Sequence, residues 1–146
     1  MEKVKVRNYR DLQVWQRSKA LAVEIYRITA TFPQREQYGL VDQMRRAAVS
    51  IPSNIAEGHI SRSPKIFARH INIALGSAAE LSTQLEIARD IGYLVEPVYQ
   101  SLQGELEEIV KMLFGLLATV THKPRRPQPN TGSSLLTTGQ PLPTTG

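Results

Sequence analysis

The side chains of this sequence with the clearest chemical capacity are its cations, which are concentrated in the first half. Residues 1–72 hold 13 Lys and Arg against 6 Asp and Glu, a balance of +7, whereas residues 73–121 hold 2 against 7, a balance of −5. Clustered cations can neutralise the phosphates of a nucleic acid, or they can meet an acidic surface on a neighbouring subunit. The charge pattern leaves both uses open. The candidate phosphate contacts are Arg7, Arg10, Arg17, Lys19, Arg45, Arg46, Arg62, Lys65 and Arg69.

Aromatic residues are sparse among these cations. Tyr9, Trp15 and Tyr38 could stack on nucleic-acid bases, but Trp15 falls on an apolar helical stripe and is expected in the core. Phosphate neutralisation reads charge and not base sequence. The sequence therefore predicts sequence-tolerant binding to structured RNA, or to an RNA–protein complex, through a basic helical hairpin. A structural, partner-binding oligomer is the alternative.

Patterns for catalysis and metal binding are missing from the sequence. His59, His70 and His122 are too scattered for a helical metal pair, and there are no cysteines. The sequence has no nucleophile elbow of the G-x-S-x-G type and no phosphate-binding glycine loop. Glu57 and His59 form the best acid–base pair, for which a loop-capping role is favoured. We therefore expect no enzymatic activity, no cofactor and no metal site.

The elements that must position these side chains are predicted to be helices. Apolar residues recur at three- and four-residue steps, which predicts an all-α fold: an antiparallel up-down four-helix bundle over residues 11–121. A basic arm, residues 1–10, precedes the bundle. A disordered tail rich in Pro, Gly, Ser and Thr follows over residues 122–146.

Capping residues predict where three of the helices begin or end. The first helix is expected to run from Asp11, as its N-cap, to about Thr31. The third is expected to begin at Ser63 and Pro64 and to end at Gly92. The fourth is expected to begin at Glu96-Pro97.

The stretch from Tyr38 to Gly58, YGLVDQMRRAAVSIPSNIAEG, predicts the second helix. Pro52 removes a backbone donor and is expected to end or kink this helix. Ser50, Ser53 and Asn54 are suited to bond the freed carbonyl groups, and Gly58 is expected to cap the C-terminus.

Several separated motifs, in a fixed order, carry a resemblance to a known family. They are YRDLQVWQ, FPQREQYGL, the Tyr38–Gly58 stretch and ALGSAAEL. From about Tyr9 to about Val120 the chain resembles the bacterial four-helix-bundle family first associated with intervening sequences in 23S rRNA genes. The resemblance implies a homopentamer. More distantly, by analogy of fold, the family resembles the accessory variability protein of diversity-generating retroelements, which binds nucleic acid and works with a reverse transcriptase.

The fourth helix has a second apolar side in addition to its core stripe. Val110, Met112, Phe114 and Leu117 broaden the stripe beyond what one bundle seam requires. A wide core face and a subunit contact explain this pattern equally well.

The ends of the sequence bear on location. The first ten residues are charged and polar, and no long apolar run follows, so we expect a cytoplasmic protein without a membrane partner. The final LPTTG resembles a sortase signal, but it lacks the export peptide and the hydrophobic segment that such signals require. Chance or an engineered tag explains the motif better than surface anchoring.

Overall fold

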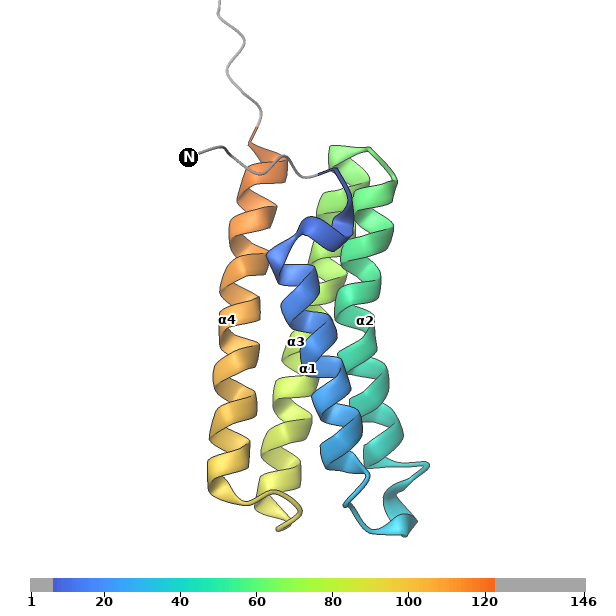
Figure 1. Ribbon diagram of the computed structural model, residues 1–146, viewed down its shortest axis with the longest axis vertical. Coiled ribbons are helices and arrows are strands. Elements are labelled where there is room, and N and C mark those ends of the chain that lie inside the picture. The colour runs from blue at the N-terminus through green and yellow to red at the C-terminus, as the bar shows by residue number, and fades with distance from the viewer. Residues whose placement is uncertain (1–6, 123–146) are drawn as a thin grey trace, which may run out of the picture.

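The computed structural model describes residues 7–122, and within them four long helices run antiparallel as a bundle (Figure 1). Each helix packs against the next along the chain, and the last packs against the first. The predicted up-down four-helix bundle is confirmed, whereas the predicted tail lies outside the described residues except for His122. In chain order the elements are η1 (Tyr9–Asp11), α1 (Gln13–Thr29), η2 (Gln34–Glu36), α2 (Leu40–Ile60), α3 (Pro64–Asp90) and α4 (Glu96–Thr121).

The core is built from the apolar positions that the helical periodicity selects. Burial of each large aliphatic side chain contributes about 1.5–3 kcal/mol, so these positions provide most of the stability of the bundle. The outward positions are therefore free to carry charge. The largest fully buried apolar side chains are Ile25, Met44, Ile51, Ile55, Ile71, Leu81, Leu85, Leu106, Ile109 and Leu113.

Both ends of α3 lie where the capping residues predict. At its start the Ser63 hydroxyl accepts a hydrogen bond from the Ile66 amide at 3.2 Å, with Pro64 in the first turn. At its end Gly92 has a φ of 89°, in the left-handed region that favours glycine. The amide of Gly92 donates to the carbonyl of Arg89, and that of Tyr93 to Ala88, which is a Schellman motif. The predicted start of α4 at Glu96-Pro97 is also confirmed.

The predicted limits of α1 differ from the observed ones by one residue at the start and by two at the end. Leu12, not Asp11, is the N-cap residue. The Asp11 carboxylate instead accepts from the amides of Arg7 and Asn8, at 3.2 and 3.1 Å, and so caps the preceding turn η1. At the other end α1 stops at Thr29, because the amides of Thr31 and Phe32 bond three residues back as the chain turns towards Pro33.

Pro52 does not end α2, which continues through it to Ile60. Asn54, one of the residues expected to bond nearby carbonyl groups, donates from Nδ2 to the Ser50 carbonyl at 2.8 Å and to the Ser50 hydroxyl at 3.0 Å. The Ser50 hydroxyl also shares a hydrogen bond of 2.8 Å with the Ser77 hydroxyl. This polar contact fixes the register of α2 against α3.

The prediction that Gly58 caps α2 is wrong, because Gly58 is buried within the last turns of the helix. A Cβ atom at this position would lie 2.8 Å from the Cβ of His70 and 2.8 Å from the Cδ1 of Phe67. Such distances are too short for carbon atoms in contact. Glycine is therefore required here because α3 passes very close to the α2 backbone.

We expect Gly58→Ala to destabilise the protein, because overpacking a tight helix contact costs about 1–3 kcal/mol. Urea denaturation followed by circular dichroism measures the change. Gly104→Ala is the matched control, since a Cβ there meets nothing within 4 Å. The control should gain up to about 1 kcal/mol from helix propensity. A Gly58→Ala protein as stable as the parent would contradict this role for Gly58.

Candidate nucleic-acid interface

Five of the nine predicted phosphate contacts gather at one end of the bundle. Figure 1 shows that η1, the α2–α3 turn and the end of α4 lie at this same end. All five side chains are exposed, and none of them forms an ion pair with another residue in the range 7–122. We refer to this set as the basic end; it consists of Arg7, Arg10, Arg62, Lys65 and Arg69.

The segment around η1 holds the first two of these cations against the bundle. The guanidinium of Arg10 lies over the ring of Tyr9, 4.8 Å from its centroid. The Tyr9 ring in turn packs edge-on against Trp15, with 5.4 Å between centroids. We expected Trp15 in the core. In the structure it is only partly buried, and it packs against the core. These rings therefore position Arg10 instead of projecting freely towards a base.

The other three cations lie in the α2–α3 turn and at the start of α3. Arg62 has a φ of 57°, and its amide donates to the His59 carbonyl at 3.3 Å. Lys65 and Arg69 follow on the first two turns of α3, four residues apart and hence on one face. The positive end of the α3 helix dipole adds positive potential to the same region.

Arg17 is bound within the chain. Its Nε and Nη2 atoms donate to the two carboxylate oxygens of Glu105, at 2.8 and 2.9 Å. These hydrogen bonds raise the pKa of Arg17 further above its already high ordinary value. The pair joins α1 to α4. Part of the predicted charge complementarity between the basic and acidic hairpins is thus satisfied inside one subunit.

Arg45 stabilises the end of α1. Its Nε donates to the Thr29 hydroxyl at 3.0 Å, its Nη2 donates to the Tyr26 carbonyl at 3.2 Å, and its guanidinium lies 4.5 Å from the centre of the Tyr26 ring. A cation at the C-terminus of a helix bonds its last carbonyl groups and complements the helix dipole. The structural contacts of Arg45 thus lie within its own chain.

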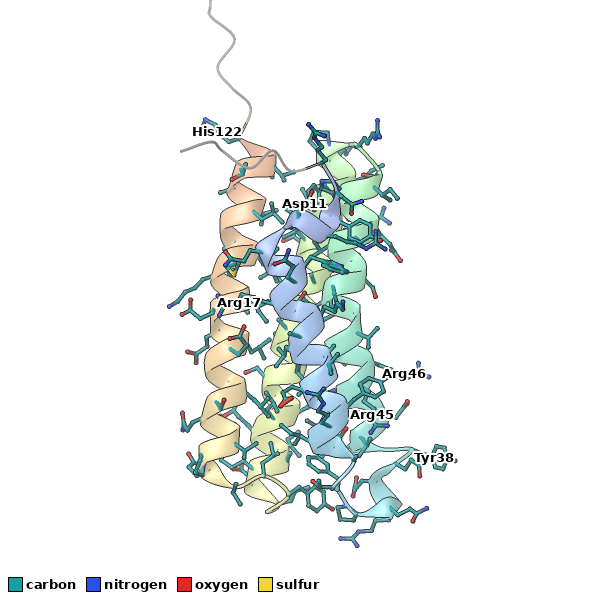
Figure 2. The ribbon with its side chains drawn as sticks, viewed as in Figure 1. Asp11, Arg17, Tyr38, Arg45, Arg46 and His122 are labelled. Atoms are coloured by element: carbon teal, nitrogen blue, oxygen red, sulfur yellow. The ribbon has the colours of Figure 1, made fainter. Side chains whose placement is uncertain are left out.

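The remaining two predicted cations also have neighbours within the chain. Arg46 donates from Nε to Asp42 at 3.1 Å, one turn earlier on α2, while most of its side chain stays exposed. Lys19 lies over the Trp15 ring at 5.2 Å. Figure 2 shows Arg45 and Arg46 together near the end of the bundle opposite to His122, and so apart from the basic end.

Sequence reasoning paired Glu57 with His59 and missed the histidine that Glu57 actually approaches. The Nδ1 atom of His70 lies 3.7 Å from the Glu57 carboxylate and 2.9 Å from Asn54 Oδ1. His59 instead packs edge-on against Phe67. His70 reaches Glu57 only because of the antiparallel register of α2 and α3, and the sequence does not reveal that register. Over the described range, no group of three or more His, Asp and Glu side chains is placed to hold a metal ion.

A pocket of about 240 Å³ opens within the basic end. It lies between the η1 segment and the last turn of α2, so it joins parts of the chain that are about fifty residues apart. Its walls combine cationic, hydrogen-bonding and apolar side chains. They are Arg7, Asn8, Tyr9, His59, Ile60 and Arg62.

Comparisons with known proteins agree with this architecture. A crystal structure of a protein of unknown function from the S23 ribosomal protein family of Bacteroides thetaiotaomicron is 28% identical to this chain. It superposes with a TM-score of 0.66, and the match covers 71% of this chain and 94% of that one. No curated protein matches the sequence. Among residues 7–122, no helix is long and apolar enough to cross a membrane.

The family model described as the 23S rRNA-intervening sequence protein matches residues 10–115. This range holds α1, α2 and α3 entire and most of α4. Apart from Tyr9, it also contains the motifs on which the resemblance was based. The chain therefore belongs to the family of 23S rRNA-intervening sequence proteins.

Proposed function

We propose that this protein is a non-enzymatic, cytoplasmic binder of structured RNA, alone or in an RNA–protein complex, that contacts phosphates through its basic end. The observation that carries the proposal is the gathering of Arg7, Arg10, Arg62, Lys65 and Arg69, all exposed and without an ion-pair partner among the described residues. The association of the family with 23S rRNA intervening sequences supports an RNA-related role.

The structure narrows the set of cations available for phosphates. Arg17 and Arg45 are committed to contacts that hold α1 in place. Neutralising a phosphate releases condensed counterions, so the logarithm of affinity falls with the logarithm of salt concentration, by roughly 0.7–0.9 per phosphate. Contacts of cations with phosphates carry no information about base sequence. Binding is therefore sequence-tolerant and strongly salt-dependent.

We expect Lys65→Ala combined with Arg69→Ala to weaken binding to a structured RNA and to reduce the salt slope by about 2. Fluorescence anisotropy across a salt series measures both quantities. Arg27→Ala combined with Arg35→Ala is the matched control: it removes the same charge, from the last turn of α1 and from η2 at the far end of the bundle. Equal losses of affinity in the two variants would mean that net charge alone causes the effect. A salt slope near zero for the parent protein would exclude phosphate contacts.

A second candidate function is self-assembly, and a groove between α3 and α4 supports it. The groove has a volume of about 480 Å³, and Leu75, Ala79 and Val110 contribute to its largely apolar walls. At its edge Phe114 remains 57% exposed. An apolar groove with an exposed aromatic ring is typical of a contact surface. Of the second apolar side of α4, Val110, Met112 and Leu117 are partly buried against the core, and Phe114 is the residue exposed for a subunit contact.

Two helix-interior glycines support the same interpretation. Gly76 on α3 and Gly115 on α4 would each place a Cβ in open space. Each costs about 1 kcal/mol relative to alanine in a helix, and no contact within the chain requires it. Close approach of another subunit would account for them.

The occupant that we propose for this groove is a second copy of the chain. The opposite, α1–α2 side of the bundle exposes Val23, Tyr26 and Val49 beside the cation Arg46. The groove is lined by Glu107 and Lys111 in addition to its apolar side chains. A contact between two different apolar surfaces is head-to-tail, and it closes into a ring when the rotation allows. The family resemblance implies five subunits. The more distant analogy with the accessory variability protein of diversity-generating retroelements adds a reverse transcriptase as a further partner to test.

We expect Phe114→Arg to lower the molar mass in solution, because a cation would replace the exposed apolar ring at the proposed interface. Light scattering coupled to size exclusion measures the mass, and circular dichroism confirms that the helices persist. Tyr38→Arg is the control, since Tyr38 is 91% exposed and lies far from the groove. A monomeric parent protein at physiological salt would refute the assembly.

A further inference from the structure

The pocket is the concave part of the basic end. Arg7 and Arg62 both line it, and they come from two distant segments of the chain. The rest of the lining is formed by Asn8, Tyr9, His59 and Ile60. Lys65 and Arg69 are not part of the lining, and they lie on the adjacent open face of α3.

The backbone on each side of the pocket is held by local hydrogen bonds. On the η1 side the Asn8 and Asp11 side chains form a capping box around the turn. On the α2–α3 side the Ser61 hydroxyl donates to the Gly58 carbonyl at 2.6 Å and accepts from the Ser63 amide at 3.2 Å. The two arginines therefore start from fixed positions. Less conformational freedom is then lost when a ligand binds.

Arg62 occupies a backbone conformation that favours glycine. Its φ of 57° lies in the left-handed region, where a side chain with a Cβ costs of order 1 kcal/mol or more. Glycine at this position would remove that strain. The presence of arginine instead is consistent with a use for its guanidinium group.

We propose that this pocket binds the terminal phosphate monoester of a nucleic-acid strand. The proposal rests on the proposed RNA-binding function and names the part of the RNA that the pocket takes. A phosphate monoester carries about −1.5 to −2 charges near neutral pH, which matches two guanidinium groups, whereas a diester within a strand carries one. A pocket closed on one side also accepts the end of a strand more readily than its continuous middle.

The other residues that line the pocket provide surfaces against which the nucleotide carrying such a phosphate can pack. Ile60 is 70% exposed and offers an apolar surface beside the cations. The ring of His59 provides a second flat surface against which a ribose or base can pack. From this first nucleotide, the following phosphates can extend over Lys65 and Arg69. The basic end would thus combine one specific contact with several non-specific ones.

The test compares RNA oligonucleotides of one sequence that carry a 5′-phosphate, a 3′-phosphate or only hydroxyl ends. With the full-length protein at fixed salt, we expect a phosphorylated end to bind about tenfold more tightly, as one additional charge-assisted contact allows. The 5′ and 3′ oligonucleotides show which end the pocket accepts, and a preference for either supports the proposal.

Arg62→Gly is the informative variant, because it removes the guanidinium group and relieves the backbone strain. We expect it to fold at least as stably as the parent and to lose the preference for phosphorylated ends. Its binding to hydroxyl-ended RNA should fall only about threefold, as for the loss of one non-specific phosphate contact. Arg7→Gln should have the same effect from the other side of the pocket. Lys65→Ala is the control, and it should weaken all three oligonucleotides equally.

Two results would overturn the proposal in distinguishable ways. Equal affinities for all three oligonucleotides, with a steep salt slope, would exclude the terminal-phosphate site and leave the general RNA-binding function intact. Absence of binding to any of them at low salt would refute both.

Discussion

The close contact between α2 and α3 is the constraint on which the rest of this structure depends. At Gly58 the two helices approach so closely that no side chain fits between them, and the Ser50–Ser77 and Asn54–His70 hydrogen bonds fix their relative position. Because polar groups inside a bundle must be paired, a shift of one helix along the other would leave these groups without partners. The turn that follows, Ser61–Ser63, is consequently short. That turn determines the position of Arg62 and the residue at which α3 begins.

The distribution of charge has a different meaning in the folded chain than in the linear sequence. The first half carries the excess of cations, but the fold divides them by role. Arg17 and Arg45 hold α1 against α4 and α2, and both use several donors of the guanidinium group to do so. The largest group of cations without an ion pair in residues 7–122 is the one at the basic end. A net charge of +7 for the first 72 residues therefore overstates the surface available to phosphates.

The sequence predicted the parts of the fold that local chemistry determines. Helical periodicity gave the four helices, and the Ser63-Pro64 and Gly92 signals gave both ends of α3, because caps and steric preferences act within a few residues. The interpretation of Gly58 as a cap failed because the close approach of α3, which requires glycine there, involves residues 67 and 70. The Arg17–Glu105 pair spans 88 positions, and His70 meets Glu57 only through the register of two helices. Such contacts leave no signal in the local sequence. The candidate cations could therefore be named from the sequence, but which of them lie together and which are paired could not be predicted.

The even number of helices brings both ends of the described chain to the same end of the bundle (Figure 1). Arg7 and His122 both lie there, beside the α2–α3 turn. Any segment attached before Arg7 or after His122 is tethered at the basic end, and its effective concentration there is set by connectivity and not by affinity. A reporter group intended to leave that end accessible therefore belongs at the other end of the bundle, in the turn around Tyr38.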